Sequence, residues 1–145
     1  MSLAAKLRRA PLRIATGAFI LNSGIGKFSG DEATAQALHG MGSGAYPVLK
    51  KVEPKVFLKI LAAGEITVGT VLLLPIVPAG LAGLALIGFS GALLGMYVRT
   101  PGLHDKYLRP TQGGTAVAKD LWMLGSGVSL LIDAALNESP ITATD

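Results

Sequence analysis

The sequence predicts an all-α, polytopic membrane protein, a bundle of four transmembrane helices with a short interfacial helix between the first and second spans. Only 15% of its residues are charged, against about 25% in a typical soluble domain. Hydrophobic residues make up 50% of the chain. The only charged side chain between Ile60 and Val98 is that of Glu65, and a bilayer core about 30 Å thick needs about 20 apolar residues per helix. We interpret residues 1–145 as one membrane domain in contact with the lipid bilayer.

Four apolar segments are predicted to span the membrane, at about residues 12–28, 56–74, 81–98 and 118–136, followed by a polar tail at 137–145. The second segment follows Pro54, which suits the first turn of a helix. The turn at 78–80 makes the second and third segments a tight antiparallel hairpin. The first segment contains Asn22 and lies between Arg13 and Lys27, whose side chains can reach the interfaces. It could instead be a secretory signal peptide, although no clear cleavage site follows it.

The connection between the first two spans contains helix signals of its own. Ser29 and Glu32 match the S-x-x-E capping box. Apolar residues then recur at helical spacing before glycines interrupt them: Ala33, Ala37, Leu38 and Met41, with Gly40, Gly42 and Gly44. We therefore predict a short interfacial helix here, whereas proline and glycine residues make the connection at 99–119 a loop.

Several other classes of function are not favoured. Both histidines, His39 and His104, fall in these connections, which argues against paired axial haem ligation inside the bundle. Neither lies in a short multi-ligand motif, so we predict no metal site. The net charge of +4 comes from basic residues that flank the apolar segments, and this pattern argues against nucleic-acid binding. The membrane orientation stays open, because the N-terminal basic cluster and the two long loops favour opposite topologies.

Glu65 is the first candidate functional residue, because a carboxylate at the centre of a span costs about 2.5 to 3.5 kcal/mol to insert. Lys27 could meet it from the first span, either as a structural ion pair or as part of a ligand site. A buried carboxyl group could carry a proton or donate a hydrogen bond to a quinone carbonyl. Lys27 could instead bind an anionic headgroup, although basic residues in the positions of Arg13 and Lys27 often only mark the two interfaces. Asp133 lies near the end of the last span and reads as an interfacial acid rather than a relay member.

Small residues favour close helix packing within a membrane. The glycines predicted to pack are Gly17, Gly24, Gly69, Gly88, Gly91, Gly95 and Gly125. Gly91 and Gly95 form a GxxxG pair that could serve either the bundle or an oligomer.

Short motifs occur in order along these segments: Arg13-x3-Gly17, Gly24-x2-Lys27-Phe28, Gly64-Glu65-x3-Gly69, and Lys119-Asp120-Leu121 followed by Gly125. Their order and spacing, with one acid in the second span, resemble the DoxX family of small four-helix bacterial membrane proteins. The resemblance implies a four-helix bundle in the bacterial cytoplasmic (inner) membrane. It also implies an association with membrane oxidoreductase complexes, since the family takes its name from a subunit linked to a thiosulfate:quinone oxidoreductase.

We therefore expect an accessory integral-membrane subunit that supports or anchors a redox complex, with Glu65 and Lys27 as its buried polar centre. If a quinone binds, Glu65 would be the proton-linked group, and Arg13, Lys27 or Arg99 would hold the headgroup. A partner complex would supply the electron donor, so the chain is not expected to be an enzyme on its own. The alternative is a self-associating structural or assembly protein that binds anionic lipid through its basic loops. A transporter or proton channel has less support, because only Glu65 lies deep in a span.

Overall fold

The computed structural model describes residues 3–138, and every regular element in this part of the chain is a helix. In order, the elements are α1 (Leu3–Phe28), α2 (Glu32–Ala45), the 3-10 helix η1 (Pro47–Lys51), α3 (Pro54–Leu73), α4 (Ala79–Arg99), α5 (Thr115–Ala118) and α6 (Asp120–Glu138). The all-helical prediction is thereby confirmed. The predicted tail at 137–145 begins within α6, and its part from residue 139 onward lies outside the described residues.

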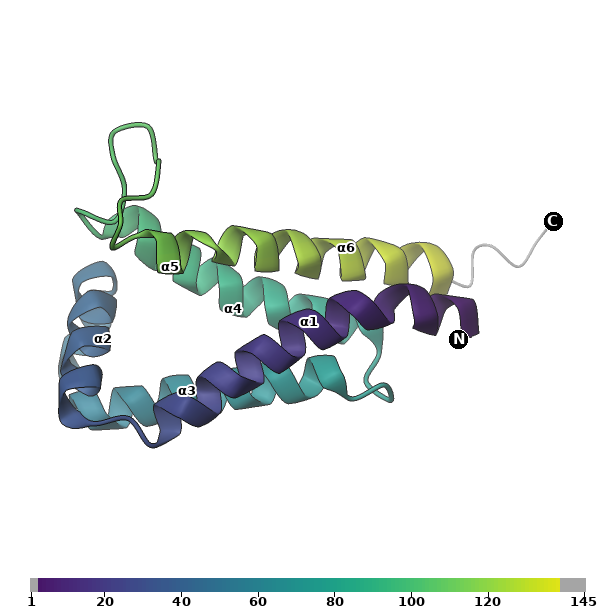
Figure 1. The fold of residues 1–145 in the computed structure, drawn as a ribbon, viewed down its shortest axis with the longest axis horizontal. Coiled ribbons are helices and arrows are strands. Elements are labelled where there is room, and N and C mark those ends of the chain that lie inside the picture. The colour runs from purple at the N-terminus through teal and green to yellow at the C-terminus, as the bar shows by residue number, and fades with distance from the viewer. Residues whose placement is uncertain (1–2, 139–145) are drawn as a thin grey trace.

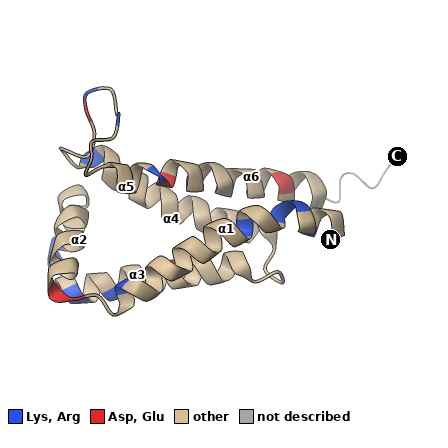
Figure 2. Ribbon diagram, in the orientation of Figure 1, with Lys and Arg blue, Asp and Glu red and all other residues tan. Residues whose placement is uncertain are grey.

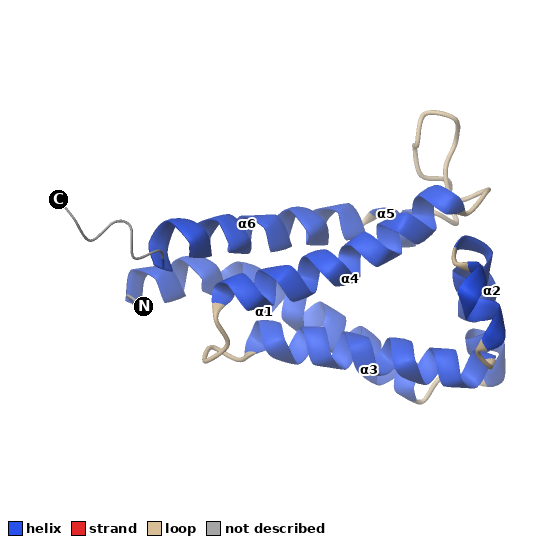
Figure 3. Cartoon of the chain, turned by 180° about the vertical axis from the view of Figure 1, so that it is seen from behind, coloured by secondary structure: helices blue, strands red, loops and turns tan. Residues whose placement is uncertain are grey.

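The long helices form two antiparallel pairs, α1 with α3 and α4 with α6 (Figure 1). The pairs approach each other where the start of α1 meets the end of α6, and they separate toward α2, which lies across the gap (Figures 1 and 3). A cluster of buried side chains joins the two pairs: Ile20, Leu72, Ala82, Leu86, Met123 and Leu130. The arrangement leaves a space on the α2 side of this cluster, and the candidate site lies there.

Three stretches in the described part of the chain are long and apolar enough to cross a membrane: α3, α4 and the stretch Thr115–Asn137, which covers α5 and most of α6. Their long uncharged sections are visible in Figure 2. These helices are consistent with a multi-pass membrane protein in contact with lipid. The first predicted span, 12–28, is not among them, and basic residues lie along α1.

Helix α1 is longer than predicted, since it begins at Leu3 rather than near residue 12 and contains Pro11. Its first turns are held against α6 by Asp133, whose carboxylate bonds both Arg8 and Arg9. The Arg8 Nε lies 2.9 Å from Asp133 Oδ1. A basic stretch near the start of α1 lies beside an acidic position of α6 in Figure 2. The ion pairs stabilise this end of α1, where Pro11 cannot donate a backbone hydrogen bond within the helix.

The predicted helix between the first two apolar segments exists as α2, but its predicted boundaries were wrong. Asp31, not Ser29, is the N-cap, and its side chain accepts a hydrogen bond from the Thr34 amide. The helix continues through the glycines to Ala45 because Gly42 packs closely on the Phe57 ring of α3. His39 therefore lies in α2 and not in a loop, with its Nε2 2.9 Å from the Leu49 carbonyl oxygen.

Six of the seven predicted packing glycines divide into two groups. A Cβ atom added at Gly17, Gly24 or Gly69 would lie 2.6 to 2.9 Å from atoms of the facing helix, so these three allow α1 and α3 to approach closely. By contrast, no described atom outside their own helices lies within 4 Å of such a Cβ at Gly88, Gly91 or Gly125. Those positions face outward. Gly95 adjoins the Tyr46 hydroxyl, and the α4/α6 contact uses Gly83 and Gly127, which the prediction omitted.

The predicted loop after α4 is confirmed for residues 100–114 and projects sideways from the helix pairs (Figure 1), whereas residues 115–118 of the predicted connection form the short helix α5. His104 Nδ1 lies 2.8 Å from the Asp105 carbonyl oxygen, and its Nε2 lies 3.1 Å from that of Val98. Because a carbonyl group only accepts hydrogen bonds, both contacts are satisfied together when the ring is protonated. The two bonds raise the pKa of His104, with that to Asp105 contributing most.

We expect the order of this loop to depend on pH. The pKa of His104 is raised in the folded loop, so its stabilising contribution is complete below the ordinary histidine value of about 6.5 and is lost as the pH rises through the raised value. Amide hydrogen exchange of residues 100–110, corrected for intrinsic rates, should show greater protection at acidic pH than at alkaline pH. His104→Gln should remove this difference, and a difference that persists in the variant would contradict the explanation.

Candidate functional site

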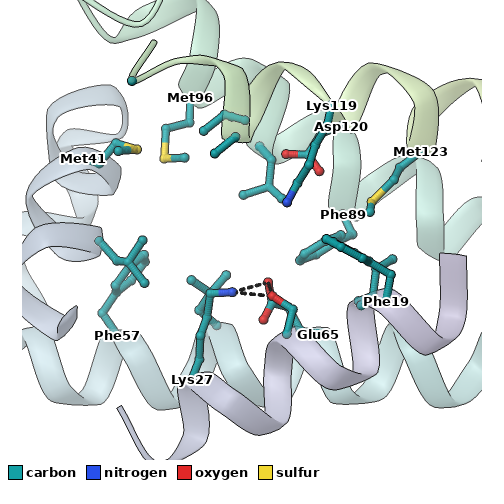
Figure 4. A pocket seen from close by; sticks show the side chains of 18 residues that line it. Phe19, Lys27, Met41, Phe57, Glu65, Phe89, Met96, Lys119, Asp120 and Met123 are labelled. Atoms are coloured by element: carbon teal, nitrogen blue, oxygen red, sulfur yellow. Dashed lines mark hydrogen bonds and ion pairs between the residues drawn. The ribbon is translucent and has the colours of Figure 1, made fainter. Parts of the chain in front are cut away.

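A cavity of about 250 Å³ lies between the two helix pairs. The 18 residues that line it come from both pairs, from α2 and from the segment that contains α5 (Figure 4). Aromatic rings and thioethers form much of its wall: Phe19, Phe57, Phe89, Met41, Met96 and Met123. Methionine adapts its shape readily and makes favourable contacts with aromatic rings. This wall suits a flat, apolar ligand.

A close approach of two helices positions the polar side chains of one wall. Gly24 of α1 lies against the backbone of α3, where an added Cβ would be 2.9 Å from the Ala62 carbonyl oxygen and from the Glu65 Cβ. Lys27 follows Gly24 by about one helical turn. The glycine thus lets α1 place its lysine beside the acid of α3.

The Lys27 Nζ lies 3.0 Å from Glu65 Oε1 and donates a second hydrogen bond of 2.6 Å to Ser23 Oγ. Ser23 in turn donates to the same carboxylate oxygen at 3.3 Å. The Glu65 side chain is only 7% exposed and that of Lys27 is 23% exposed. The structure therefore brings together the two residues that the sequence predicted as the buried polar centre.

The second carboxylate oxygen of Glu65 is different. Among the described residues, Oε2 is buried and has no hydrogen-bond partner. Buried polar atoms without a partner are rare in folded proteins, because such an atom has lost its hydration and gained nothing in exchange. Glu65 and Lys27 both point into the cavity in Figure 4, so a ligand there could supply the missing hydrogen bond.

The opposite wall carries a second acid and a second base, at the junction of α5 and α6 (Figure 4). Asp120 is 4% exposed and is the first residue of α6, where the positive end of the helix dipole favours a carboxylate. Lys119 places its Nζ 4.5 Å from the centre of the Phe19 ring, within the range of a cation–π contact. Two acids and two bases therefore face the cavity.

The other three predicted site residues lie away from this cavity. Arg13 is buried, but its guanidinium donates to backbone carbonyls at the end of α3. Arg99 is exposed at the end of α4 and lies 5.0 Å over the Tyr46 ring. Asp133 pairs with the two arginines of α1. Their positions assign these three to contacts between structural elements.

Sequence reasoning missed Lys119, Asp120 and Ser23 as site residues. Ser23 precedes Lys27 by four residues, a spacing that places two side chains on one face of a helix. The Lys119-Asp120 pair stands directly before the last apolar segment, and charges at such a boundary are usually interfacial. No three histidine, cysteine, aspartate or glutamate side chains gather into a metal-binding group within residues 3–138.

The fold and the site together define an all-helical protein with membrane-length apolar helices and an internal cavity that contains an acid–base pair. No protein-family model, curated protein or solved structure matches this chain.

Proposed function

We propose that the protein crosses the bacterial cytoplasmic membrane four times as a helix bundle, with α1 as the first span. The 26 residues of α1 correspond to about 39 Å of helix at 1.5 Å per residue, which exceeds a bilayer core of about 30 Å. Its buried charges have partners, since Arg13 bonds carbonyl groups and Lys27 bonds Glu65. Lys6 and Arg8 lie near one end, where long basic side chains can reach the interface.

We propose further that this protein is an accessory subunit of a membrane redox complex and holds a quinone headgroup in the cavity. The observation that carries the proposal is the buried Oε2 of Glu65, which has no hydrogen-bond partner within residues 3–138. A quinol hydroxyl can donate to this oxygen, whereas Lys27 can donate to a quinone carbonyl. The aromatic and methionine side chains of the wall suit the faces of the ring. The partner complex supplies the electrons, and this chain binds and positions the headgroup.

Glu65→Gln tests this function. A hydrogen bond to a charged group contributes about 1.5 to 3 kcal/mol, so we expect the affinity for a tailless benzoquinol to fall about 10- to 150-fold. Quenching of the single tryptophan, Trp122, by the ligand provides the binding curve in mild detergent. Lys59→Gln is the control, because Lys59 is an exposed residue of the same helix and its replacement should leave the affinity unchanged.

The binding and folding of Glu65→Gln distinguish a ligand-binding role of Glu65 from a purely structural one. A folded Glu65→Gln protein with weakened binding supports the ligand site. A variant that unfolds, while the wild type shows no saturable binding, would make Glu65 a structural residue and contradict the proposal.

A second candidate function is a self-associating assembly protein that binds anionic lipid. The outward-facing Gly88 and Gly91 of α4, with no described atom outside their own helix within 4 Å of an added Cβ, form a surface on which another helix could pack closely. Crosslinking in native membranes would distinguish the candidates, since Gly91→Leu should abolish a homo-oligomer but leave quinone binding intact.

A further inference from the structure

A groove of about 290 Å³ lies beside the cavity, on the outer surface between α1 and α6. It is lined by Ala15, Thr16, Phe19, Lys119, Trp122, Met123 and Ser126. Three of these side chains, Phe19, Lys119 and Met123, also line the cavity. The same residues thus form the boundary between the cavity that contains the Lys27–Glu65 pair and the groove on the outer surface.

The size of the cavity limits what can lie wholly inside it. An apolar cavity of about 150 Å³ accommodates benzene, whereas sites for larger small molecules measure about 300 to 1,000 Å³. At about 250 Å³, this cavity has room for one substituted ring. Any longer ligand has to leave the cavity, and the shared boundary leads to the groove.

The walls of the groove suit a hydrocarbon chain. Ala15, Phe19, Trp122 and Met123 provide an apolar lining. Trp122 is 78% exposed and Phe19 is 50% exposed, so both would face the lipid if the helices cross a membrane. At the boundary, Lys119 lies over Phe19 in a cation–π contact at 4.5 Å, and the long stem of a lysine side chain allows it to rotate aside.

We propose that this groove binds the hydrocarbon tail of a single-chain amphiphile whose ring headgroup lies in the cavity. The inference rests on the proposed function and extends it, since it assigns the ligand class as a ring with an isoprenoid or alkyl tail. The tail passes between Phe19 and Lys119, and the ligand enters sideways from the bilayer. Lys119 is then a positioning residue that lies between the two parts of the ligand.

Tail length provides the first test. Each buried methylene group is worth about 0.8 kcal/mol, so two of them raise affinity about tenfold. After correction for partition into detergent, the wild type should bind a decyl benzoquinone at least about tenfold more tightly than the tailless ring. Ala15→Phe should remove this advantage and leave the affinity for the tailless ring unchanged, because Ala15 lines the groove and not the cavity.

Leu84→Phe is the matched control, since it adds the same ring on an exposed position of α4. It should retain the full effect of the tail. An equal tail advantage in Ala15→Phe and Leu84→Phe would overturn the groove assignment. Failure of the tailless ring to bind wild type would instead overturn the proposed headgroup site.

The second test uses the position of the single tryptophan and does not require Ala15→Phe to fold. A decyl benzoquinone with bromine on the tail should quench Trp122 saturably and more strongly than the unbrominated compound. In the double variant Trp122→Phe, Leu84→Trp, the only tryptophan lies on the outward face of α4, where quenching should rise linearly without saturation. Equal quenching in both proteins would show that the tail is dissolved in the detergent and would overturn the inference. A brominated alkane without a headgroup that quenches Trp122 as strongly would overturn it too.

Discussion

Arg13→Gln is expected to lower the free energy of unfolding by about 3 to 5 kcal/mol, because it would remove the side-chain donor from one buried and three part-buried carbonyl groups. The guanidinium of Arg13 donates to Leu72 O at 2.7 Å, Leu74 O at 2.8 Å, and Val71 O and Val77 O at 3.0 Å each. The last carbonyl groups of a helix have no intrahelical partner. Arg13 therefore caps α3 from a different helix.

The local sequence explains why α3 needs such a cap. Helices commonly end with a glycine in the left-handed conformation, but here Leu74 and Pro75 follow the last turn, and Leu74 is extended with φ −75° and ψ 112°. A cation near the C-terminus is also favoured by the helix dipole. One residue of α1 thus holds the end of α3 and, through Val77, the turn that leads to α4.

Unfolding of each variant in the same detergent measures the effect. Arg13→Lys should recover less than half of the loss, since an ammonium group cannot reproduce the planar fork of the guanidinium. Lys59→Gln is the control, because Lys59 is exposed and a change within about 0.5 kcal/mol is expected there. If Arg13→Gln matched this control, the cap would contribute little to stability.

The apolar helices were predictable because their signal is local. Pro54 lies at the start of α3 and the turn before α4 contains Pro78, so the boundaries follow from residues adjacent to them in sequence. The start of α1 was not predictable in this way. Its basic first turns are matched by Asp133, which lies 124 positions after Arg9, and no short-range pattern contains that information.

The candidate site likewise has a part that local sequence patterns predict and a part that they do not. A lone acid in an apolar segment predicted the importance of Glu65, and the small residue Gly24 made an approach of Lys27 plausible. Lys119 and Asp120 reach the cavity because of the path of the loop after α4. This loop places the start of α6 beside the space between the two helix pairs (Figure 1). That loop includes Leu108 with φ 61°, a conformation uncommon for leucine, and its path is not encoded in a simple periodic pattern.

The contact between α1 and α3 leads to the second large expected effect. At Gly69, an added Cβ would lie 2.6 Å from the Leu21 amide nitrogen and 2.8 Å from its Cα. These are backbone atoms of the facing helix, so the clash can be relieved only by moving α1 away from α3. Overpacking typically costs about 1 to 3 kcal/mol, and we expect Gly69→Val to lie at or above the upper end of this range.

The same displacement should reach the candidate site, because Gly24 and Lys27 lie farther along the same face of α1. Gly69→Val is therefore expected to weaken the Lys27–Glu65 pair, whose oxygen and nitrogen are 3.0 Å apart, and to reduce ligand affinity together with stability. Gly64→Val is the matched control on α3, since no described atom beyond its own helix lies within 4 Å of a Cβ there. Unfolding and ligand titration of both variants measure the two effects. If Gly69→Val lowered stability and ligand affinity no more than Gly64→Val does, the close approach of α1 and α3 would not be what positions Lys27.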